Sequence, residues 1–540
     1  MSQFATRIPW RCLVMGTAGV LMGLAPVNAW PLAWVALAPL WWGVQHVSQT
    51  FLGAQSPAQQ SSQPPVKRQL LALLPLPLCW SLGYHGTALS WILHLHPLTW
   101  MGIPWLGSIA ISLFAWAAIT IWGMVLVSLW ALGLATAQRY LPDAPSRILV
   151  GTALWCGLEA LWNLSPLDWT TLAYTQSPGN LVILHLGQIA GPLTVSALLV
   201  AVNGVLAETV RTGSWRSGGA IALTLCLTGH LIGFTLYQQP LNDPPEQAIP
   251  VGIIQGNIPT RQKLSAEGVR RSRDVYLQGY RDLAQVGVEA VLTPEGAVPV
   301  LFDTAQKETD LFYRLVSDQP ITAPVLWLGQ FLLEPVDRDH ITQSLISIVP
   351  QQGIVGQYDK IKLVPLGEYI PLQSVFGKLI SRLSPIGTDM IPGGTQQQFE
   401  TGLGPAAGGI CFDSAFSWLF RRQVAHGGEF ILTASNIDPY PRRTMIQLHG
   451  HEVMRAIETS RWAARATNTG LSSIIDAHGQ TVWLSTANQT VIHADTLYRR
   501  QHHTPYVRWG NWLTPLLVGL SLCRLWLNRI QPEPRSFPQG

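Results

Sequence analysis

The stretch GGICFDSAF, from Gly408 to Phe416, ends a predicted β-strand in a cysteine that is followed two residues later by an acid. Cys411 is the only cysteine in the polar half of the chain, because the other cysteines lie within or beside long apolar runs, at positions 12, 79, 156, 226 and 523. No Cys-x-x-Cys pair is present, so the sequence predicts neither a disulfide framework nor a zinc site. A lone cysteine after a strand is either a small buried hydrophobic residue or a nucleophile, and its surroundings decide between the two.

Strand-like and helical segments alternate on both sides of this stretch, from residue 248 to residue 505. Strands are predicted at 251–255, 288–293, 325–329, 344–349, 353–358, 408–411, 430–433 and 471–475, and helices at 266–286 and 449–466. The region has 22 basic and 23 acidic residues, which is typical of a globular domain. This alternation predicts a layered α/β domain whose reactive groups gather just beyond the strand ends.

Three residues with complementary chemistry stand at such strand ends: Glu295, Lys360 and Cys411. Taken singly, a Glu before Gly is most often an exposed turn residue, a Lys in a polar stretch is most often a surface charge, and a lone Cys after a strand is most often a core residue. Together they supply what acyl transfer requires, because a thiol is a weak nucleophile until a base removes its proton. A carboxylate can take that proton, and an ammonium group can stabilise both the thiolate and the oxyanion that follows attack.

The remainder of the chain has the composition of a membrane protein. The 540 residues are 48% hydrophobic and 12% charged, with 23 tryptophans, whereas soluble proteins carry about 25% charged residues. A spanning helix needs about 20 apolar residues, and such runs lie near 12–27, 29–46, 70–93, 104–136, 147–163, 181–207, 219–237 and 511–528. The charge pattern offers no basic surface to a polyanion, so no nucleic-acid partner is expected.

Basic residues in the short loops predict the orientation of these eight runs. With the N-terminus inside, the inner loops and the tail hold Arg7, Arg11, Lys67, Arg68, Arg139, Arg147, Arg211, Arg216, Arg529 and Arg535, whereas the outer loops near 97–103 and 164–180 hold no Lys or Arg. We therefore predict seven spans within 1–240, an extracytoplasmic domain at 248–505, an eighth span at 511–528 and a cytoplasmic tail at 529–540. The alternative, a cleaved secretory signal ending near 27–29, is disfavoured by the spans that follow.

Few polar groups interrupt the predicted spans. Glu159 lies mid-span, where an unpaired charge costs several kcal/mol, so it is expected to face the interior of the bundle. Asn203, His185 and His230 are expected to be hydrogen-bond partners between helices rather than ligands.

The motifs that carry the three candidate residues resemble those of the nitrilase superfamily, and more specifically those of the apolipoprotein N-acyltransferase family. The matching stretches are Ile254–Pro259, Thr293–Gly296, Tyr358–Pro371, Gly409–Asp413, Ala434–Asn436 and Arg465–Gly470, with Trp30–Pro39 and Leu172–Gln176 in the spans. The resemblance implies a polytopic α-helical membrane bundle of eight spans that carries an α/β nitrilase-like domain, an αββα sandwich, before the last span.

The resemblance also implies residue roles. Glu295 is expected to be the general base, Lys360 the oxyanion stabiliser and Cys411 the nucleophile, and Glu368 matches a further acid that supports the site. Lys362 stands where relatives often have His and is not expected to be the catalytic lysine.

Three departures from the family pattern lie close to these residues. Phe412 and Asp413 replace the usual Tyr and Glu, Leu264 replaces an expected aromatic residue, and Ile437-Asp-Pro-Tyr440 replaces the usual Asp-Ala-Trp. We therefore expect Phe412, Asp413, Asn436 and Tyr440 to be candidates for the substrate wall.

The function that the resemblance implies is transfer of a fatty acyl chain in lipoprotein maturation. The acyl chain would pass from a membrane phospholipid, through a thioester on Cys411, to the amine of the diacylglyceryl-cysteine of an apolipoprotein. The expected place is the bacterial inner membrane, with the catalytic domain on the periplasmic face. A monomer is expected, with no cofactor and no metal.

Two other functions remain open from the sequence. A membrane-tethered amidase would pass the acyl group to water instead, and a transporter or receptor would not need Cys411. Apolar residues between 372 and 383 recur at helical spacing and indicate either an amphipathic arm that dips into the membrane or an ordinary packed helix.

Overall fold

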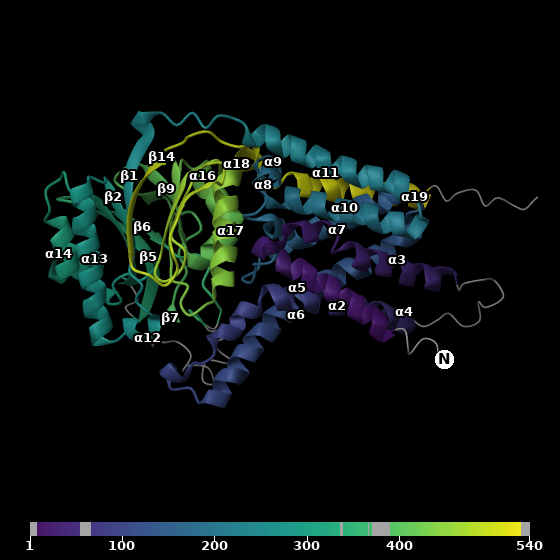
Figure 1. The fold of residues 1–540 in the computed structure, drawn as a ribbon, viewed down its shortest axis with the longest axis horizontal. Coiled ribbons are helices and arrows are strands. Elements are labelled where there is room, and N and C mark those ends of the chain that lie inside the picture. The colour runs from purple at the N-terminus through teal and green to yellow at the C-terminus, as the bar shows by residue number, and fades with distance from the viewer. Residues whose placement is uncertain (1–7, 54–65, 335–338, 366, 370–388, 531–540) are drawn as a thin grey trace, which may run out of the picture.

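The computed structural model describes residues 8–53, 66–334, 339–365, 367–369 and 389–530. A helical bundle occupies one side of the molecule and an α/β domain the other, with helix α17 (Arg442–Thr459) lying between them (Figure 1). The predicted 54–65 loop, the 372–383 arm and most of the 529–540 tail lie outside the described residues.

The bundle contains a helix in every predicted apolar run. Its helices are α2 (Ile8–Leu24), α3 (Ala38–Gly53), α4 (Val66–Leu73), α5 (Pro75–Ala88), α6 (Trp105–Ala137), α7 (Ala144–Trp162), α8 (Leu181–Leu184), α9 (Gly187–Ala190), α10 (Pro192–Thr212), α11 (Trp215–Tyr237) and α19 (Leu513–Ile530). In the described part of the chain, four stretches are long and apolar enough to cross a membrane: Trp10–Val27, Trp105–Tyr140, Pro192–Thr212 and Trp215–Tyr237. The count of eight spans therefore stays a prediction.

One predicted span, 181–207, is wrong as a single helix. The chain forms the short helices α8 and α9 before α10 begins at Pro192. Gly191 separates α9 from α10 with a φ of +82°, and a Cβ there would meet the ring of Tyr506 at 2.5 Å. The break thus brings the start of α10 against the segment that leads to α19.

The bundle interior is dense in tryptophan and is cross-linked by a few polar side chains. Trp41, Trp80, Trp130 and Trp155 are almost completely buried there. Asn203 accepts hydrogen bonds from the N–H groups of Leu37 and Ala38 and donates to the carbonyls of Ala33 and Leu199. Its predicted role as a partner between helices is confirmed.

Glu159 and the two predicted histidines also find partners inside the protein. Glu159 is buried on α7, and its carboxylate accepts the N–H of Leu172 at 2.8 Å. The imidazole of His230 contacts the Asn180 amide at 3.2 Å, whereas His185 contacts His478 of the α/β domain at 3.2 Å. Glu159 therefore faces the interior as expected, and His185 joins the two domains rather than two helices.

The α/β domain contains two facing sheets. The first has the order β14-β1-β2-β4-β5-β6, with β3 beside β4 and β7 beside β5, and the second has the order β13-β12-β11-β10-β9-β8. The strands are β1 (Ala248–Gln255), β2 (Ala290–Leu292), β3 (Leu301–Phe302), β4 (Val325–Leu333), β5 (His340–Val349), β6 (Gly353–Asp359), β7 (Asp389–Met390), β8 (Phe399–Glu400), β9 (Pro405–Ile410), β10 (Phe430–Ser435), β11 (Ala463–Thr467), β12 (Ser473–Ile475), β13 (Thr481–Leu484) and β14 (Val491–Tyr498).

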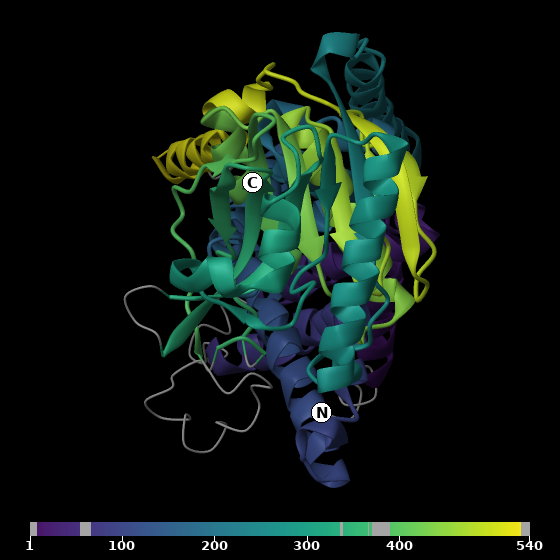
Figure 2. The ribbon, with the colours of Figure 1, turned by 90° about the vertical axis from the view of Figure 1, so that its left-hand side faces the viewer.

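Helices cover the outer face of each sheet, which gives the predicted αββα order of layers. Helices α13 (Ala266–Val286) and α14 (Leu311–Ser317) lie in front of the first sheet (Figure 2), and α16 (Ser417–Ala425) and α17 lie on the second. Side chains alternate along the strands, so Trp327 of β4 faces Phe430 of β10, with ring centroids 5.9 Å apart, while Leu326 and Leu328 pack under the helices.

Local signals explain which helix boundaries the sequence predicts well. Helix α13 has its predicted bounds, because Ser265 caps its start by accepting the N–H of Gly268 and Gly287, with a φ of +88°, ends it. The helix predicted at 449–466 is wrong in its last part: α17 ends at Thr459, Ser460 has a φ of +54°, and β11 follows.

Helix α17 is buried on both sides. One side covers the second sheet, where His449 contacts the Thr481 hydroxyl of β13 at 2.9 Å. The other side lies on the bundle, where Ser177 donates to the carbonyl of Gly450 at 2.6 Å and the Arg455 guanidinium donates to the Tyr174 hydroxyl at 2.9 Å. The α/β domain is therefore attached to the bundle through its own helical layer.

Candidate active site

The three predicted catalytic residues meet at one edge of the sandwich. Lys360 and Cys411 directly follow β6 and β9, Glu295 comes three residues after β2, and Asn436 directly follows β10. Strands β2 and β6 run in the same direction within the first sheet, as β9 and β10 do within the second. The carboxyl ends of strands from both sheets thus converge, which brings residues more than a hundred positions apart into one site.

Lys360 lies between two carboxylates. Its Nζ is 3.0 Å from Oε1 of Glu295 and 2.5 Å from Oε1 of Glu368, and its side chain is fully buried. Burial alone would lower the pKa of Lys360, but Glu295 and Glu368 together hold that pKa well above its usual value. Lys360 therefore carries a positive charge at every physiological pH, as an oxyanion stabiliser must.

The two carboxylates differ in how they are held. Oε2 of Glu295 accepts the backbone N–H of Asn436 at 2.8 Å, and Oε2 of Glu368 accepts the N–H of Val364 at 2.9 Å. Burial raises the pKa of Glu368, and the charge of Lys360 acts in the opposite direction. Glu368 thus ties Lys360 to its own loop, whereas Glu295 connects Lys360 to the strand end next to Cys411.

Cys411 has a backbone conformation that L-residues seldom adopt, with a φ of +52°. Its Sγ lies 4.0 Å from the carbonyl oxygen of Asn436, to which the thiol donates. Burial and, next, the charge of Glu295 raise the pKa of Cys411, while Lys360 acts to lower it. The resting group is therefore a thiol, and it needs a base before it can attack.

Asp413 is completely buried, and its carboxylate has three donors inside the domain. Oδ2 accepts the Tyr358 hydroxyl and the N–H of Ile410, each at 3.0 Å, and Oδ1 accepts the N–H of Lys362 at 2.7 Å. These bonds join the loop of Cys411 to the loop of Lys360. We therefore assign Asp413 to holding these loops together rather than to the substrate wall.

Phe412 and Tyr440 face the membrane bundle and contact two of its tryptophans. The Phe412 ring stacks on Trp169, with centroids 6.1 Å apart and planes at 19°, and the Tyr440 ring meets Trp91 edge-on at 4.9 Å. Trp91 and Trp169 are themselves 5.3 Å apart. We call this set of four rings, Phe412, Trp169, Trp91 and Tyr440, the interdomain aromatic wall.

Two known families match the chain in sequence. The Apolipoprotein N-acyltransferase N-terminal domain matches residues 18–205, and the Carbon-nitrogen hydrolase family matches residues 252–497. Curated proteins called apolipoprotein N-acyltransferase from Nostoc sp. and Synechocystis sp. are 47% and 44% identical to the chain. Each alignment covers 94% of this chain, with 97% of the Nostoc protein and 99% of the Synechocystis protein.

The chain belongs to the apolipoprotein N-acyltransferase family. Another protein called apolipoprotein N-acyltransferase, from Pseudomonas putida, is 28% identical to this chain, and the alignment covers 94% of each chain. Among solved structures, a Saccharomyces cerevisiae member of branch 10 of the nitrilase superfamily covers 47% of this chain and 90% of its own, with 15% identity and a TM-score of 0.36. Membership of this family, together with the apolar helices, makes the protein a bacterial membrane protein with a nitrilase-like domain.

Lys362 and Leu264 also differ from the residues common in the family, and among the described residues neither takes part in the ion pairs that join Lys360 to Glu295 and Glu368. Nζ of Lys362 lies 4.4 Å from the centre of the Phe416 ring and 3.4 Å from the carbonyl oxygen of Ser165, so it points to the bundle. The side chain of Leu264 is exposed. The aromatic rings of the wall therefore come from Phe412 and Tyr440 of the α/β domain and from Trp91 and Trp169 of the bundle.

Sequence reasoning missed Lys263 and Trp169. Lys263 is buried, and its Nζ donates to the backbone carbonyl of Glu295 at 3.0 Å; burial lowers its pKa to about 8, against the opposing charge of Glu295. A lysine in a short polar stretch is typical of a surface position, so composition gives no signal for Lys263. Trp169 lies more than 240 positions before Cys411, and only the folded structure brings the two regions together.

Proposed function

We propose that this protein transfers a fatty acyl chain from a membrane phospholipid to the N-terminal amine of the diacylglyceryl-cysteine of an apolipoprotein. The observation that carries the proposal is the meeting of Glu295, Lys360 and Cys411 in a member of the apolipoprotein N-acyltransferase family. The three groups are those that a thioester mechanism needs, namely a base, a fixed cation and a thiol.

The first half-reaction loads the enzyme. Glu295 takes the proton of the Cys411 thiol, and the thiolate attacks the ester carbonyl carbon of the phospholipid. The buried ammonium of Lys360 stabilises the negative oxygen of the tetrahedral intermediate, where low polarity strengthens the attraction. The intermediate then expels the alkoxide of the lysophospholipid, which takes the proton back from Glu295, and a thioester remains on Cys411.

The second half-reaction transfers the acyl chain from Cys411 to the acceptor amine. The neutral amine of the diacylglyceryl-cysteine attacks the thioester carbonyl, and Lys360 again stabilises the oxyanion. Glu295 accepts a proton from the attacking nitrogen and passes it to the departing sulfur of Cys411, which restores the thiol. An α-amine has a pKa of about 7.7–8.0, so a useful fraction is neutral without further activation.

The membrane arrangement follows from the same substrates, because both are lipids held in a bilayer. We propose eight spans, seven within residues 1–240 and one at 511–528, in the bacterial inner membrane, with residues 248–505 on the periplasmic face. The absence of Lys and Arg from the loops near 97–103 and 164–180 supports this orientation. We propose that the protein acts as a monomer.

Intact-mass spectrometry after incubation with phospholipid alone tests the proposal. A fatty-acyl mass increment is expected on the wild-type protein and not on Cys411→Ser. If the wild-type protein transfers acyl chains without ever acquiring this increment, the thioester route is wrong. Release of free fatty acid with no transfer to a lipopeptide would instead support a membrane-tethered hydrolase.

A further inference from the structure

We propose that Trp169, a residue of the membrane bundle, decides whether the acyl thioester on Cys411 reacts with an amine or with water. This inference rests on the function proposed above and adds a specificity-determining residue outside the catalytic domain. Trp169 stacks on Phe412, the residue directly after the nucleophile, and so forms the bundle side of the interdomain aromatic wall.

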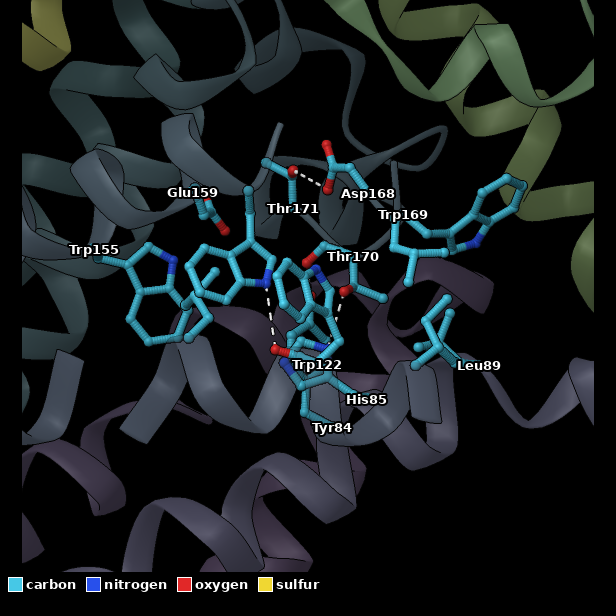
Figure 3. Close-up of a pocket in the computed structure, with 15 residues that line it drawn as sticks. Tyr84, His85, Leu89, Trp122, Trp155, Glu159, Asp168, Trp169, Thr170 and Thr171 are labelled. Atoms are coloured by element: carbon cyan, nitrogen blue, oxygen red, sulfur yellow. Dashed lines mark hydrogen bonds between the residues drawn. The ribbon is translucent and has the colours of Figure 1, made fainter. Parts of the chain in front are cut away.

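The chain around Trp169 is held firmly from the bundle side. The carbonyl of Thr170 accepts the Tyr84 hydroxyl at 2.7 Å, and the Thr170 hydroxyl contacts Nδ1 of His85 at 2.9 Å. In Figure 3 Trp169 is one of the residues that line the small pocket beside Glu159, and its ring lies on the side of the ribbon of the α/β domain. These bonds position the ring before any substrate binds, so no rearrangement is needed to place it.

The ring of Trp169 is also held from the side of the catalytic domain. Its Nε1 donates to Oε1 of Gln447 on α17 at 2.8 Å, and the amide of Gln447 donates to the carbonyl of Ala88 in the bundle at 3.0 Å. The ring of His451, also on α17, meets Trp169 edge-on at 4.7 Å. Trp169 is buried among these partners, so the position of its ring depends on how the α/β domain packs against the bundle.

The contact between Trp169 and Phe412 offers water no hydrogen-bond partner. Phe412 has no polar atom in its side chain, and the single polar atom of the Trp169 side chain is already used by Gln447. A water molecule on this side of the thioester would therefore lose hydrogen bonds without replacement, which is unfavourable. An acyl chain, in contrast, gains from contact with these two rings because it buries apolar surface.

This difference matters because two nucleophiles compete for one intermediate. Attack by water gives a free fatty acid and the Cys411 thiol, whereas attack by the lipoprotein amine gives an amide and the same thiol. Glu295 can accept the proton from either nucleophile, so the catalytic residues themselves do not discriminate. Exclusion of water at the wall is then what favours the amide product.

The test follows the fate of the loaded enzyme. The full-length protein in detergent is acylated with labelled phospholipid, freed from excess lipid, and followed with and without a diacylglyceryl lipopeptide. Without lipopeptide, we expect Trp169→Ala to lose its label as free fatty acid at least about tenfold faster than the wild type, because opening the wall lowers the barrier for water. Trp169→Phe, which keeps a ring beside Phe412 but loses the bond to Gln447, should lose its label faster than the wild type by a smaller factor than Trp169→Ala.

A matched control removes a tryptophan of the same bundle whose ring contact is with another bundle tryptophan and not with a ring of the wall. Trp162, at the end of α7, packs against Trp122 with ring centroids 4.9 Å apart and planes at 30°. Trp162→Ala should leave the hydrolysis rate unchanged, so a general loosening of the bundle can be told apart from opening of the wall. If Trp169→Ala fails to fold, Gln447→Leu, which removes the bond to the indole, should raise hydrolysis in the same direction by a smaller factor.

The possible results separate the two proposals. If the wild-type protein never acquires the label on Cys411, the thioester route proposed above is wrong. If the label is acquired but both Trp169→Ala and Gln447→Leu lose it at the wild-type rate, the thioester route stands and the role of Trp169 is wrong. Equal acceleration in Trp162→Ala would also overturn the role of Trp169, because the effect would then not belong to the wall.

Discussion

At the scale of single residues, Cys411 is surrounded by charges that act on it in opposite directions. Burial and the carboxylate of Glu295 raise the pKa of its thiol, and the ammonium of Lys360 lowers it. In the proposed reaction, the same two neighbours act as the base and as the oxyanion stabiliser. The effect of each residue on thiol ionisation can therefore be separated from its effect on acyl transfer.

We predict that Glu295→Gln and Lys360→Met change alkylation of Cys411 by iodoacetamide in opposite directions. At a fixed pH between 7 and 9, Glu295→Gln should be alkylated faster than the wild type, since loss of the negative charge lowers the thiol pKa, and Lys360→Met should be alkylated more slowly. Acyl transfer should nevertheless fall at least about 100-fold in both variants. Slower alkylation of Glu295→Gln would contradict this charge arrangement.

Asp413 shows how a residue beside a nucleophile can be structural. The Asp413→Ala change leaves the Tyr358 hydroxyl and the N–H groups of Ile410 and Lys362 without an acceptor in a buried place. Each such loss costs about 1–3 kcal/mol, so we expect the free energy of unfolding to fall by at least about 2 kcal/mol. Asp413→Asn keeps one carbonyl oxygen and should lose less. Thermal unfolding in detergent measures both, and an unchanged midpoint for Asp413→Ala would refute the assignment.

At the scale of secondary-structure elements, α17 is buried between the second sheet and the bundle, so its charged side chains need partners inside the protein. Its Arg455 forms a fully buried ion pair with Glu458 one turn later, with Nε 2.9 Å from Oε1, and also donates to the Tyr174 hydroxyl of the bundle. Charges in such a place are tolerated only as a pair, since either one alone would remain without a counter-ion.

This pairing predicts a strongly non-additive double-mutant cycle. Arg455→Met and Glu458→Leu should each lower the stability by about 3–5 kcal/mol, because each leaves one buried charge unpaired. The double variant should be more stable than either single variant. Chemical unfolding of the three variants measures the coupling, with Tyr174→Phe as a control that keeps the ion pair and removes the hydroxyl that accepts from Arg455 and donates to the carbonyl of Ala415. Additive losses would show that the pair is not what holds α17.

The elements also show how far sequence alone could lead. Helix α13 was predictable to the residue because a cap, an apolar stripe and a final glycine agree on its bounds. The boundary between α17 and β11 could not be predicted from the sequence. Ala463, Ala464 and Ala466 favour a helix in isolation and become a strand only by pairing with β10. In the site, the strand ends and family motifs predicted Glu295, Lys360 and Cys411, whereas Lys263 and Trp169 depend on contacts that leave no pattern in the sequence.

At the scale of the whole molecule, the nitrilase-like domain and the membrane bundle together form the interdomain aromatic wall. Trp91 and Trp169 of the bundle contact Tyr440 and Phe412 of the catalytic domain, so the wall is complete only when both parts are assembled. Both proposed substrates are lipids, so the side of the membrane on which the domain lies decides which lipids and proteins it can meet. Orientation is therefore part of the function.

Thiol labelling of intact cells tests that orientation. His426 lies exposed at the end of α16, and Arg216 lies exposed at the start of α11, in a loop that the basic residues place inside. With a membrane-impermeant maleimide, we expect His426→Cys to react in intact spheroplasts and Arg216→Cys to react only after the membrane is opened, each above the background of the native cysteines. The reverse pattern would place the catalytic domain in the cytoplasm. If both cysteine variants react in intact spheroplasts, the two positions lie on the same side of the membrane. That result would contradict the single span, 219–237, that we predict between them.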